Sequence, residues 1–163
     1  MTDVAANRFT HLDERGSPRM VDVGGKAVTR RTARAQARVG FPPDAAQVFA
    51  ENDYATAKGP VFHTAIVAGV LAAKRTHELI PFCHPLGLED CNIAVNMSGD
   101  EAIVDCRVSL HGQTGVEMEA LTGASIAALT IYDMCKSLSK GIVIRELRLL
   151  EKTGGKSGDW QAT

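Results

Sequence analysis

Two residues that could transfer protons stand three positions apart in a long stretch with helical spacing. Asp133 and Lys136 fall in the expected helix 117–138, where residues three apart share one face. As a surface ion pair they would stabilise the fold by less than about 1 kcal/mol. The apolar neighbours Tyr132 and Met134 favour a second interpretation, in which burial of the pair shifts both pKa values and creates an acid/base couple.

Two carboxylates open the same helix. Glu117 and Glu119 lie where the helix dipole favours negative charge, and that effect alone could account for one of them. Glu119 and Asp133 are 14 positions apart, which is about 21 Å along a continuous helix. Because this length is large for one small-molecule site, catalysis at both ends would require two copies of the helix to meet. We therefore expect a homo-oligomer with active sites at subunit interfaces.

Two basic residues stand where a structural role and a functional one must be weighed. Arg31 is isolated among small apolar residues on the odd-numbered face of an alternating stretch. The pattern alone favours a register slip or a rim arginine with a buried stem over an anion ligand on a buried sheet face. Lys58 precedes Gly59-Pro60 at the start of an expected helix, where a cation is locally unfavourable. It is either a solvated loop lysine or a residue that faces a phosphate or acts in catalysis.

A basic, glycine-rich segment, Lys152–Gly158, follows the last expected strand. Gly155-Lys156-Ser157 resembles the end of a phosphate-binding P-loop, but Leu150 occupies the position of the first required glycine. We therefore exclude a P-loop. The segment either wraps an anion through backbone N–H groups and its lysines, Lys152 and Lys156, or frays as a chain terminus.

His84 lies between Cys83 and Pro85 in a proline-bracketed turn over residues 81–86. A stiff turn holds the imidazole in one orientation, which suits hydrogen bonding to a ligand. A metal site is poorly supported, because no second pair of ligands has suitable spacing.

The elements that must position these residues alternate between strand and helix patterns. Period-two alternation predicts a strand from Val21 to Val39, and a hairpin joins two further strands. Helical spacing predicts one long helix on each side of the hairpin. The pattern indicates an α+β fold with helices on one face of an antiparallel sheet. The expected elements are strands 21–39, 91–97, 102–110 and 142–150, helices 44–51, 61–79 and 117–138, and a loop over 52–59.

Composition is that of an ordinary soluble domain. The 163 residues are 45 % hydrophobic and 23 % charged, with a formal net charge of −1, so no global charge favours nucleic acid. No run reaches the roughly 20 apolar residues that span a membrane, and no secretory signal precedes the domain. The four cysteines form no CxxC pair and are expected as free thiols in the cytoplasm. We expect a flexible tail over residues 1–18 and one catalytic domain over residues 19–163.

The chain resembles the MoaC family of cyclic pyranopterin monophosphate synthases from about Phe9 to Trp160. The run from Leu129 to Lys136 is the strongest match, and Gly115–Leu121 is the next. The other matching segments are Met20–Val23, Lys58-Gly59, Ala73–Thr76, Ile80–Leu86 and Leu149–Asp159. The resemblance implies a ferredoxin-like fold and a hexamer built as a trimer of dimers. It also implies conversion of a cyclised dihydro-GTP to cyclic pyranopterin monophosphate and pyrophosphate, in molybdenum cofactor biosynthesis.

The resemblance assigns roles to individual positions. Its catalytic set comprises Asp133, Lys136 and Lys58, and its triphosphate-facing arginine is Arg31. The remaining substrate-binding positions are Phe82, Cys83, His84, Glu117, Met118, Glu119, Lys152 and Lys156.

The implied rearrangement involves no redox change, so no nicotinamide or flavin is expected. Proton transfers by Asp133, Lys58 and Lys136 would suffice, with Mg²⁺ accompanying the triphosphate and no dedicated protein metal site. A regulatory module that binds a nucleotide at a subunit interface is the competing class. A metal-dependent phosphohydrolase is a weaker alternative, because the chain lacks a carboxylate or histidine cluster.

Overall fold

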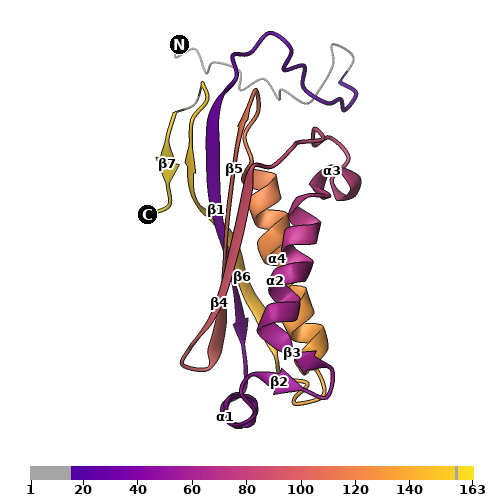
Figure 1. Ribbon diagram of the computed structural model, residues 1–163, viewed down its shortest axis with the longest axis vertical. Helices are drawn as coiled ribbons and strands as arrows, with labels where there is room; N and C mark the ends of the chain where they lie inside the picture. Colours follow the sequence, from indigo (N-terminus) through magenta and orange to yellow (C-terminus); the bar gives the residue numbers. More distant parts are fainter. Residues whose placement is uncertain (1–15, 157) are drawn as a thin grey trace, which may run out of the picture.

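A five-stranded sheet and a layer of helices form the body of the computed structural model, which describes residues 16–156 and 158–163 (Figure 1). Residues 1–15, most of the tail expected over residues 1–18, lie outside this part of the chain. The strands are β1 (Thr29–Gly40), β2 (Ala55–Thr56), β3 (Gly59–Pro60), β4 (Asp90–Ser98), β5 (Glu101–Gly112), β6 (Val143–Thr153) and β7 (Trp160–Gln161). The helices are α1 (Pro43–Glu51), α2 (Val61–Ala73), α3 (Thr76–Leu79) and α4 (Glu117–Cys135).

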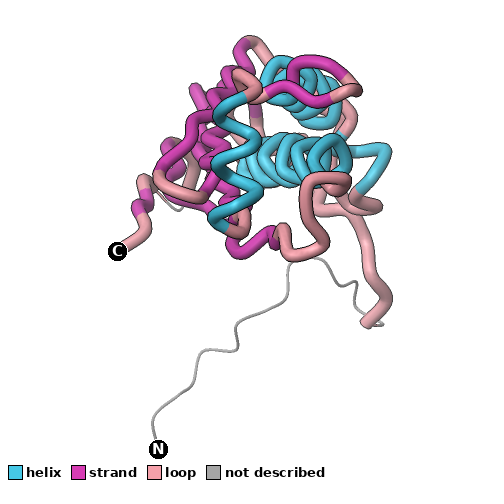
Figure 2. The backbone as a smooth tube through the Cα atoms, turned by 90° about the horizontal axis from the view of Figure 1, so that it is seen from below, coloured by secondary structure: helices cyan, strands magenta, loops and turns pink. Residues whose placement is uncertain are grey.

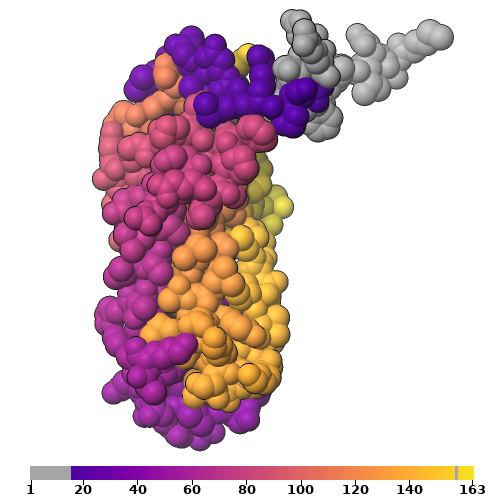
Figure 3. Space-filling model, turned by 90° about the vertical axis from the view of Figure 1, so that its right-hand side faces the viewer, coloured from indigo at the N-terminus to yellow at the C-terminus, as the bar shows by residue number. Residues whose placement is uncertain are grey.

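The sheet has the order β4-β5-β1-β6-β7, and every neighbouring pair is antiparallel. The chain order β1-α2-β4-β5-α4-β6 with this strand order is the β-α-β-β-α-β arrangement of ferredoxin-like folds. Helices α2 and α4 cover one face of the sheet, which Figure 2 shows from below. The space-filling view from the helix side shows an elongated molecule with α4 (orange) beside α2 (magenta) (Figure 3). The expected α+β class is confirmed.

The alternation in β1 separates the two faces of the sheet as expected. Ala33, Ala35, Ala37 and Val39 are buried under the helices, and the residues between them are half-buried. The strand begins at Thr29, so the expectation of a strand from Val21 was wrong at this end.

The chain before β1 turns because of two local hydrogen bonds. The Asp22 carboxylate accepts the Gly24 N–H at 2.8 Å, and the Lys26 N–H donates to the Val23 carbonyl at 2.9 Å. Asp side chains commonly form such turns, which compete with a sheet ladder for the same backbone groups.

Several other boundaries also differ from the expected ones. The helix expected over 61–79 is divided into α2 and α3 at Lys74 and Arg75, where the Arg75 N–H donates to the Ala72 carbonyl three residues back, at 2.9 Å. Helix α4 ends at Cys135 instead of Leu138, and the loop expected over 52–59 contains the β2–β3 hairpin. Strand β6 extends to Thr153, and β7 pairs with its end.

Small residues allow α2 and α4 to approach closely. Gly69 of α2 faces Gly123 of α4, and a Cβ atom at Gly69 would lie 2.8 Å from the Gly123 carbonyl oxygen. It would also lie 2.5 Å from Cδ1 of Ile93 and 3.2 Å from Cβ of Ala127. Because a backbone oxygen cannot move aside as a flexible side chain can, Gly69 fixes the spacing between the two helices.

The substitution Gly69→Ala tests this packing. We expect it to lower the free energy of unfolding by about 1–3 kcal/mol, because the overlap outweighs the helix-propensity gain of about 1 kcal/mol. The matched control is Gly87→Ala, since a Cβ atom there meets no atom within 4 Å. Denaturant unfolding of both variants is the measurement, and equal stability of Gly69→Ala and the wild type would contradict the packing argument.

Candidate active site

A pocket of about 460 Å³ lies at the end of the molecule where β1 begins and α4 starts. Six segments line it: the chain before β1, the start of β1, the turn after α3, the β5–α4 connection, the start of α4, and the glycine-rich tail. All nine residues expected to bind substrate are among its lining residues, namely Arg31, Phe82, Cys83, His84, Glu117, Met118, Glu119, Lys152 and Lys156. The fold thus brings together residues that are more than 100 positions apart in the sequence.

Arg31 supplies a buried positive charge to the pocket. It is 8 % exposed, and the β1–β5 pairing continues past it without a shift, which excludes a register slip. Its Nε donates to the Gly112 carbonyl at 3.3 Å, and its Nη2 donates to the Gln113 carbonyl at 3.5 Å. Within residues 16–156 and 158–163 it has no carboxylate at ion-pair distance. A buried guanidinium whose partners are neutral carbonyls retains its charge for an anionic ligand.

The tail folds against Arg31 through two consecutive glycines. Gly154 and Gly155 both have φ +85°, a backbone conformation that L side chains rarely adopt. A Cβ atom at Gly155 would overlap Nη1 of Arg31. The tail therefore needs glycine here, both for its turn and for its contact with the guanidinium, and this contact places Lys156 at the pocket.

Glu119 supplies a buried carboxylate to the same pocket. It is 3 % exposed, and burial raises its pKa to about 7, with a further contribution from the charge of Glu117. Burial also raises the pKa of the Cys83 thiol, and the Glu119 charge adds to that effect. Glu117 itself forms an ion pair with Lys152, at 3.3 Å between Oε1 and Nζ. The first turn of α4 thus presents one paired and one desolvated carboxylate.

The turn after α3 supplies ring and sulfur groups to the rim. Phe82 and Met118 both line the pocket and are both exposed. Nε2 of His84 lies 2.8 Å from the Val21 carbonyl oxygen, so this nitrogen carries the proton and donates it. This contact with the chain before β1, which the sequence did not indicate, orients the imidazole.

Two further lining residues, Lys26 and Gln113, were missed by the sequence analysis. Lys26 was assigned to a strand face, and Gln113 lay in an unassigned connection. The Gly24-Gly25 pair next to Lys26 was the available signal, because two glycines in a row favour a turn over a strand.

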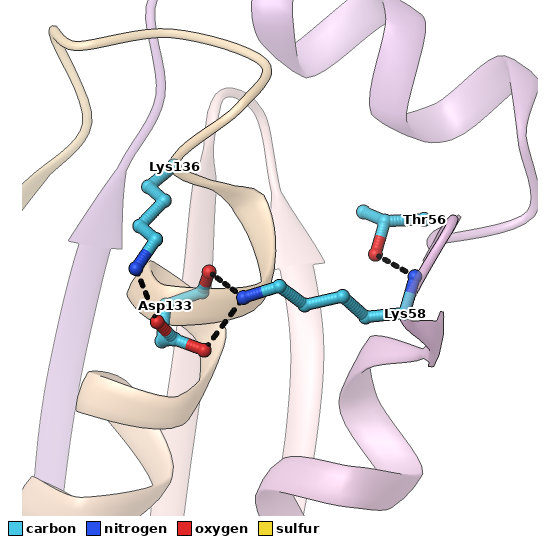
Figure 4. Close-up of polar contacts among 4 residues, drawn as sticks. All are labelled: Thr56, Lys58, Asp133 and Lys136. Atoms are coloured by element: carbon cyan, nitrogen blue, oxygen red, sulfur yellow. Dashed lines mark hydrogen bonds and ion pairs between the residues drawn. The ribbon is translucent and has the colours of Figure 1, made fainter.

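The expected catalytic residues form a separate group, the lysine–aspartate cluster of Lys58, Asp133 and Lys136 (Figure 4). Lys58 Nζ donates to Oδ2 of Asp133 at 2.8 Å and to its main-chain carbonyl at 2.9 Å. Lys136 Nζ donates to Oδ1 of the same carboxylate at 2.7 Å. Asp133 is thus held between two ammonium groups, one from its own helix and one from the β2–β3 hairpin.

The lysine–aspartate cluster is exposed, so the expectation of a buried Asp133–Lys136 couple was wrong for the single chain. The side chains of Lys58, Asp133 and Lys136 are 49 %, 56 % and 53 % exposed. Hydrogen bonds from Lys136 and then Lys58 lower the pKa of Asp133 to about 2, and the bond to Asp133 raises the pKa of Lys136. The apolar neighbours do not bury this pair, because adjacent residues of a helix point in different directions.

An aromatic group under the β2–β3 hairpin positions Lys58. The Phe49 ring contacts Tyr54 and Phe62 edge-on, with centroids 5.3 and 5.6 Å apart, and Tyr54 stacks on Phe62 at 5.0 Å. The Val61 N–H donates to the Tyr54 carbonyl across the base of the hairpin, at 3.1 Å. The Lys58 N–H donates to Oγ1 of Thr56 at 3.2 Å, which shapes the tip (Figure 4).

The pocket and the lysine–aspartate cluster lie at opposite ends of α4, because Glu117 and Glu119 of its first turn line the pocket and Asp133 lies in its last turn. The helix is continuous from Glu117 to Cys135, so Glu119 and Asp133 are about 21 Å apart along its axis. One chain therefore brings the nine expected binding residues together and keeps the three expected catalytic residues away from them.

Three further features bear on the chemistry available. The four cysteines are free thiols, and Cys106 and Cys135 are fully buried. Among the described residues, no group of three or more His, Cys, Asp or Glu side chains could hold a metal ion. None of the described helices is long and apolar enough to cross a membrane.

Comparison with known proteins agrees with the resemblance noted in the sequence. The cyclic pyranopterin monophosphate synthases of Xanthomonas oryzae pv. oryzae and Xanthomonas axonopodis pv. citri are each 53 % identical over 150 residues. The protein of the same name from Xanthomonas campestris pv. campestris is 52 % identical over 150 residues. Each alignment covers 91 % of this chain and 91 % of the relative. The protein-family model described as the MoaC family matches residues 20–155, and the chain belongs to that family.

Proposed function

We propose that this chain is a cyclic pyranopterin monophosphate synthase of molybdenum cofactor biosynthesis. It converts a cyclised dihydro-GTP to cyclic pyranopterin monophosphate and releases pyrophosphate. The observation that carries the proposal is a pocket that combines lysines and a buried carboxylate with a buried arginine, whose partners among the described residues are carbonyls, in a chain 53 % identical to synthases of that name. A purine nucleotide needs such a combination, since its phosphates and its base demand different partners.

The phosphate half of the substrate would bind at Arg31, Lys152 and Lys156. Arg31 offers N–H groups with no competing carboxylate among the described residues, and the two lysines lie on the tail that folds against it. These cations also stabilise the charge that develops on the leaving pyrophosphate. Mg²⁺ would arrive with the triphosphate. The chemistry needs no redox cofactor. Ring opening and ring closure break and form C–N bonds with accompanying proton transfers, and the phosphate cyclisation is a phosphoryl transfer that expels pyrophosphate.

The base half of the substrate would bind at Glu119 and His84, beside Phe82, Cys83 and Met118. With a pKa of about 7, Glu119 is partly protonated at neutral pH, so its carboxyl can donate as well as accept a hydrogen bond. A guanine-derived ring presents both donors and acceptors, and the flat Phe82 side chain at the mouth suits its faces.

Asp133, Lys58 and Lys136 would perform the proton transfers. In the single chain the pKa shifts favour an ionised aspartate and a protonated Lys136, so at neutral pH Asp133 is in the form that accepts a proton and Lys136 in the form that donates one. Covering it would remove water from around the three groups and make their mutual interactions stronger. In such a covered site the three groups could exchange protons with a bound substrate.

A complete active site would need two subunits. A pocket and a lysine–aspartate cluster that are about 21 Å apart on one rigid helix cannot meet in one chain. We propose that each site joins the pocket of one subunit to the cluster of another, within a hexamer built as a trimer of dimers. We also assign the enzyme to the cytoplasm, which agrees with its four free thiols.

The first test is turnover by the wild type and by Asp133→Asn. Anaerobic incubation with the cyclised dihydro-GTP should yield the pterin and pyrophosphate in equal amounts. Asp133→Asn keeps the shape but cannot accept a proton, so we expect kcat to fall at least about 10²-fold with the oligomer intact. The control Asp100→Asn changes an exposed aspartate of the β4–β5 turn and should leave kcat unchanged. A wild type that binds the substrate and returns it unaltered would instead favour the regulatory module.

The composite site predicts that two inactive variants complement each other. Arg31→Met removes the pocket charge, and Asp133→Asn disables the lysine–aspartate cluster. After equal mixing, unfolding and reassembly, a pair that holds one of each has one site with both halves intact. About a quarter of all sites, and hence of the wild-type activity, should return. Mixed oligomers that native mass spectrometry detects but that show no activity would contradict shared sites.

The raised pKa of Glu119 makes stability depend on pH. Its ordinary value is 4.5 and its folded value is about 7, so between these pH values the unfolded state loses a proton that the folded state keeps. Stability due to this group therefore falls as pH rises through that window. At about pH 8, Glu119→Gln should be more stable than the wild type by up to about 3 kcal/mol, and the gap should close near pH 4.5.

Denaturant unfolding across this pH range measures the gap. The control is Glu78→Gln, the same change on an exposed glutamate of α3, for which no pH-dependent gap is expected. A Glu119→Gln curve parallel to that of the wild type would show that Glu119 is not desolvated.

A further inference from the structure

The chain from Met20 to Val28, which we call the strap, runs along the rim of the pocket. Val21, Val23 and Lys26 of the strap line the cavity. Val21 and Val23 are half-buried, and all the other strap residues are exposed. Apolar burial is the main force that holds a segment on a protein surface, so the strap is weakly held by this force.

Local hydrogen bonds give the strap its shape but do not attach it. The bond from the Gly24 N–H to Asp22 and that from the Lys26 N–H to Val23 both remain inside the strap. They would persist if the whole segment moved away from the pocket. Contacts with the rest of the molecule must therefore determine where Lys26 lies.

Two side chains make hydrogen bonds from the body of the molecule to the strap backbone. His84 donates to the Val21 carbonyl at 2.8 Å. Gln113 donates from Nε2 to the Lys26 carbonyl at 2.9 Å and to the Gly24 carbonyl at 3.3 Å. A carboxamide nitrogen has two hydrogens, so one side chain can serve both carbonyls. The Gly24–Lys26 half of the strap is thus attached through Gln113.

Gln113 also contacts the arginine of the pocket. Its main-chain carbonyl accepts the Nη2 hydrogen bond of Arg31 at 3.5 Å. One residue therefore lies between the buried cation of the pocket and the strap cation, with its main chain on Arg31 and its side chain on the carbonyl of Lys26. This geometry fixes the main chain of Lys26 relative to Arg31, and both residues line the same cavity.

We propose that Gln113 is a positioning residue that holds the strap over the pocket and sets Lys26 beside Arg31 for the substrate phosphates. The catalytic consequence rests on the proposed function, whereas the attachment of the strap does not. The side chain of Gln113 acts through backbone carbonyls, so the required property is a hydrogen-bond donor of suitable length. Methionine matches its length without a donor, and lysine supplies a donor from a different group.

Hydrogen–deuterium exchange of the strap tests the attachment. In Gln113→Met, peptides from residues 18–28 should exchange several-fold faster than in the wild type, because two of the strap's hydrogen bonds to the body are lost. Gln113→Lys should restore most of the protection. The control Gln47→Met removes a surface bond to Glu51 on α1, at the other end of the molecule, and should leave the strap unchanged. Unaltered strap exchange in Gln113→Met overturns the proposal.

Steady-state kinetics with the cyclised dihydro-GTP tests the consequence. Loss of the Gln113 donor should raise KM roughly tenfold, because Lys26, which would then be misplaced, is proposed to bind the substrate phosphates. The value of kcat should stay within about twofold of the wild type. A raised KM without faster strap exchange overturns the proposal, because Gln113 would then contact the substrate itself. If the wild type shows no turnover, the proposed function fails, and the exchange rates still decide whether Gln113 attaches the strap.

Discussion

Close packing of α4 on α2 and the sheet is the constraint on which the rest of this structure depends. Glycine and alanine residues line the contact, and Gly69 against Gly123 leaves no room for a further carbon atom. A helix packed this tightly is rigid. Glu119 lies in the first turn of α4 and Asp133 in the last, so backbone geometry fixes their separation and no side-chain movement can close it.

The two ends of α4 differ in what surrounds their charged groups. In the pocket, burial raises the pKa of Glu119 to about 7, and Arg31 is bound only to carbonyl oxygens among its described contacts. In the lysine–aspartate cluster, two ammonium groups hold one carboxylate in solvent, and their hydrogen bonds lower the pKa of Asp133 to about 2. Burial therefore dominates the electrostatics of the pocket, whereas hydrogen bonds between exposed groups dominate those of the cluster.

The sequence predicted the parts of this arrangement that follow from periodic burial. Alternation around Arg31 located β1 and its buried face, and helical spacing located α4, because apolar burial in regular elements repeats with a known period. It failed where a single polar contact decides the structure. The Asp22 turn shortened β1, and the hydrogen bond from the Arg75 N–H to the Ala72 carbonyl marks the break between α2 and α3. The burial of Asp133 was misjudged because apolar neighbours in sequence were taken for neighbours in space.

The segments that periodicity could not predict also carry the exposed lysines at the two ends of α4. No residue of the strap with Lys26 or of the hairpin with Lys58 is fully buried, so the alternation in the strap did not correspond to a strand. Side chains of the body hold both segments. The Phe49 aromatic group supports the hairpin, and hydrogen bonds from His84 and Gln113 support the strap. A long ammonium side chain on a weakly buried segment can adjust to a ligand at low energetic cost, provided that the segment itself is fixed. The strand β1 and the helix α4 thus fix the buried charges of Arg31 and Glu119. A few contacts from the body of the molecule fix the segments that carry the exposed lysines, Lys26 and Lys58.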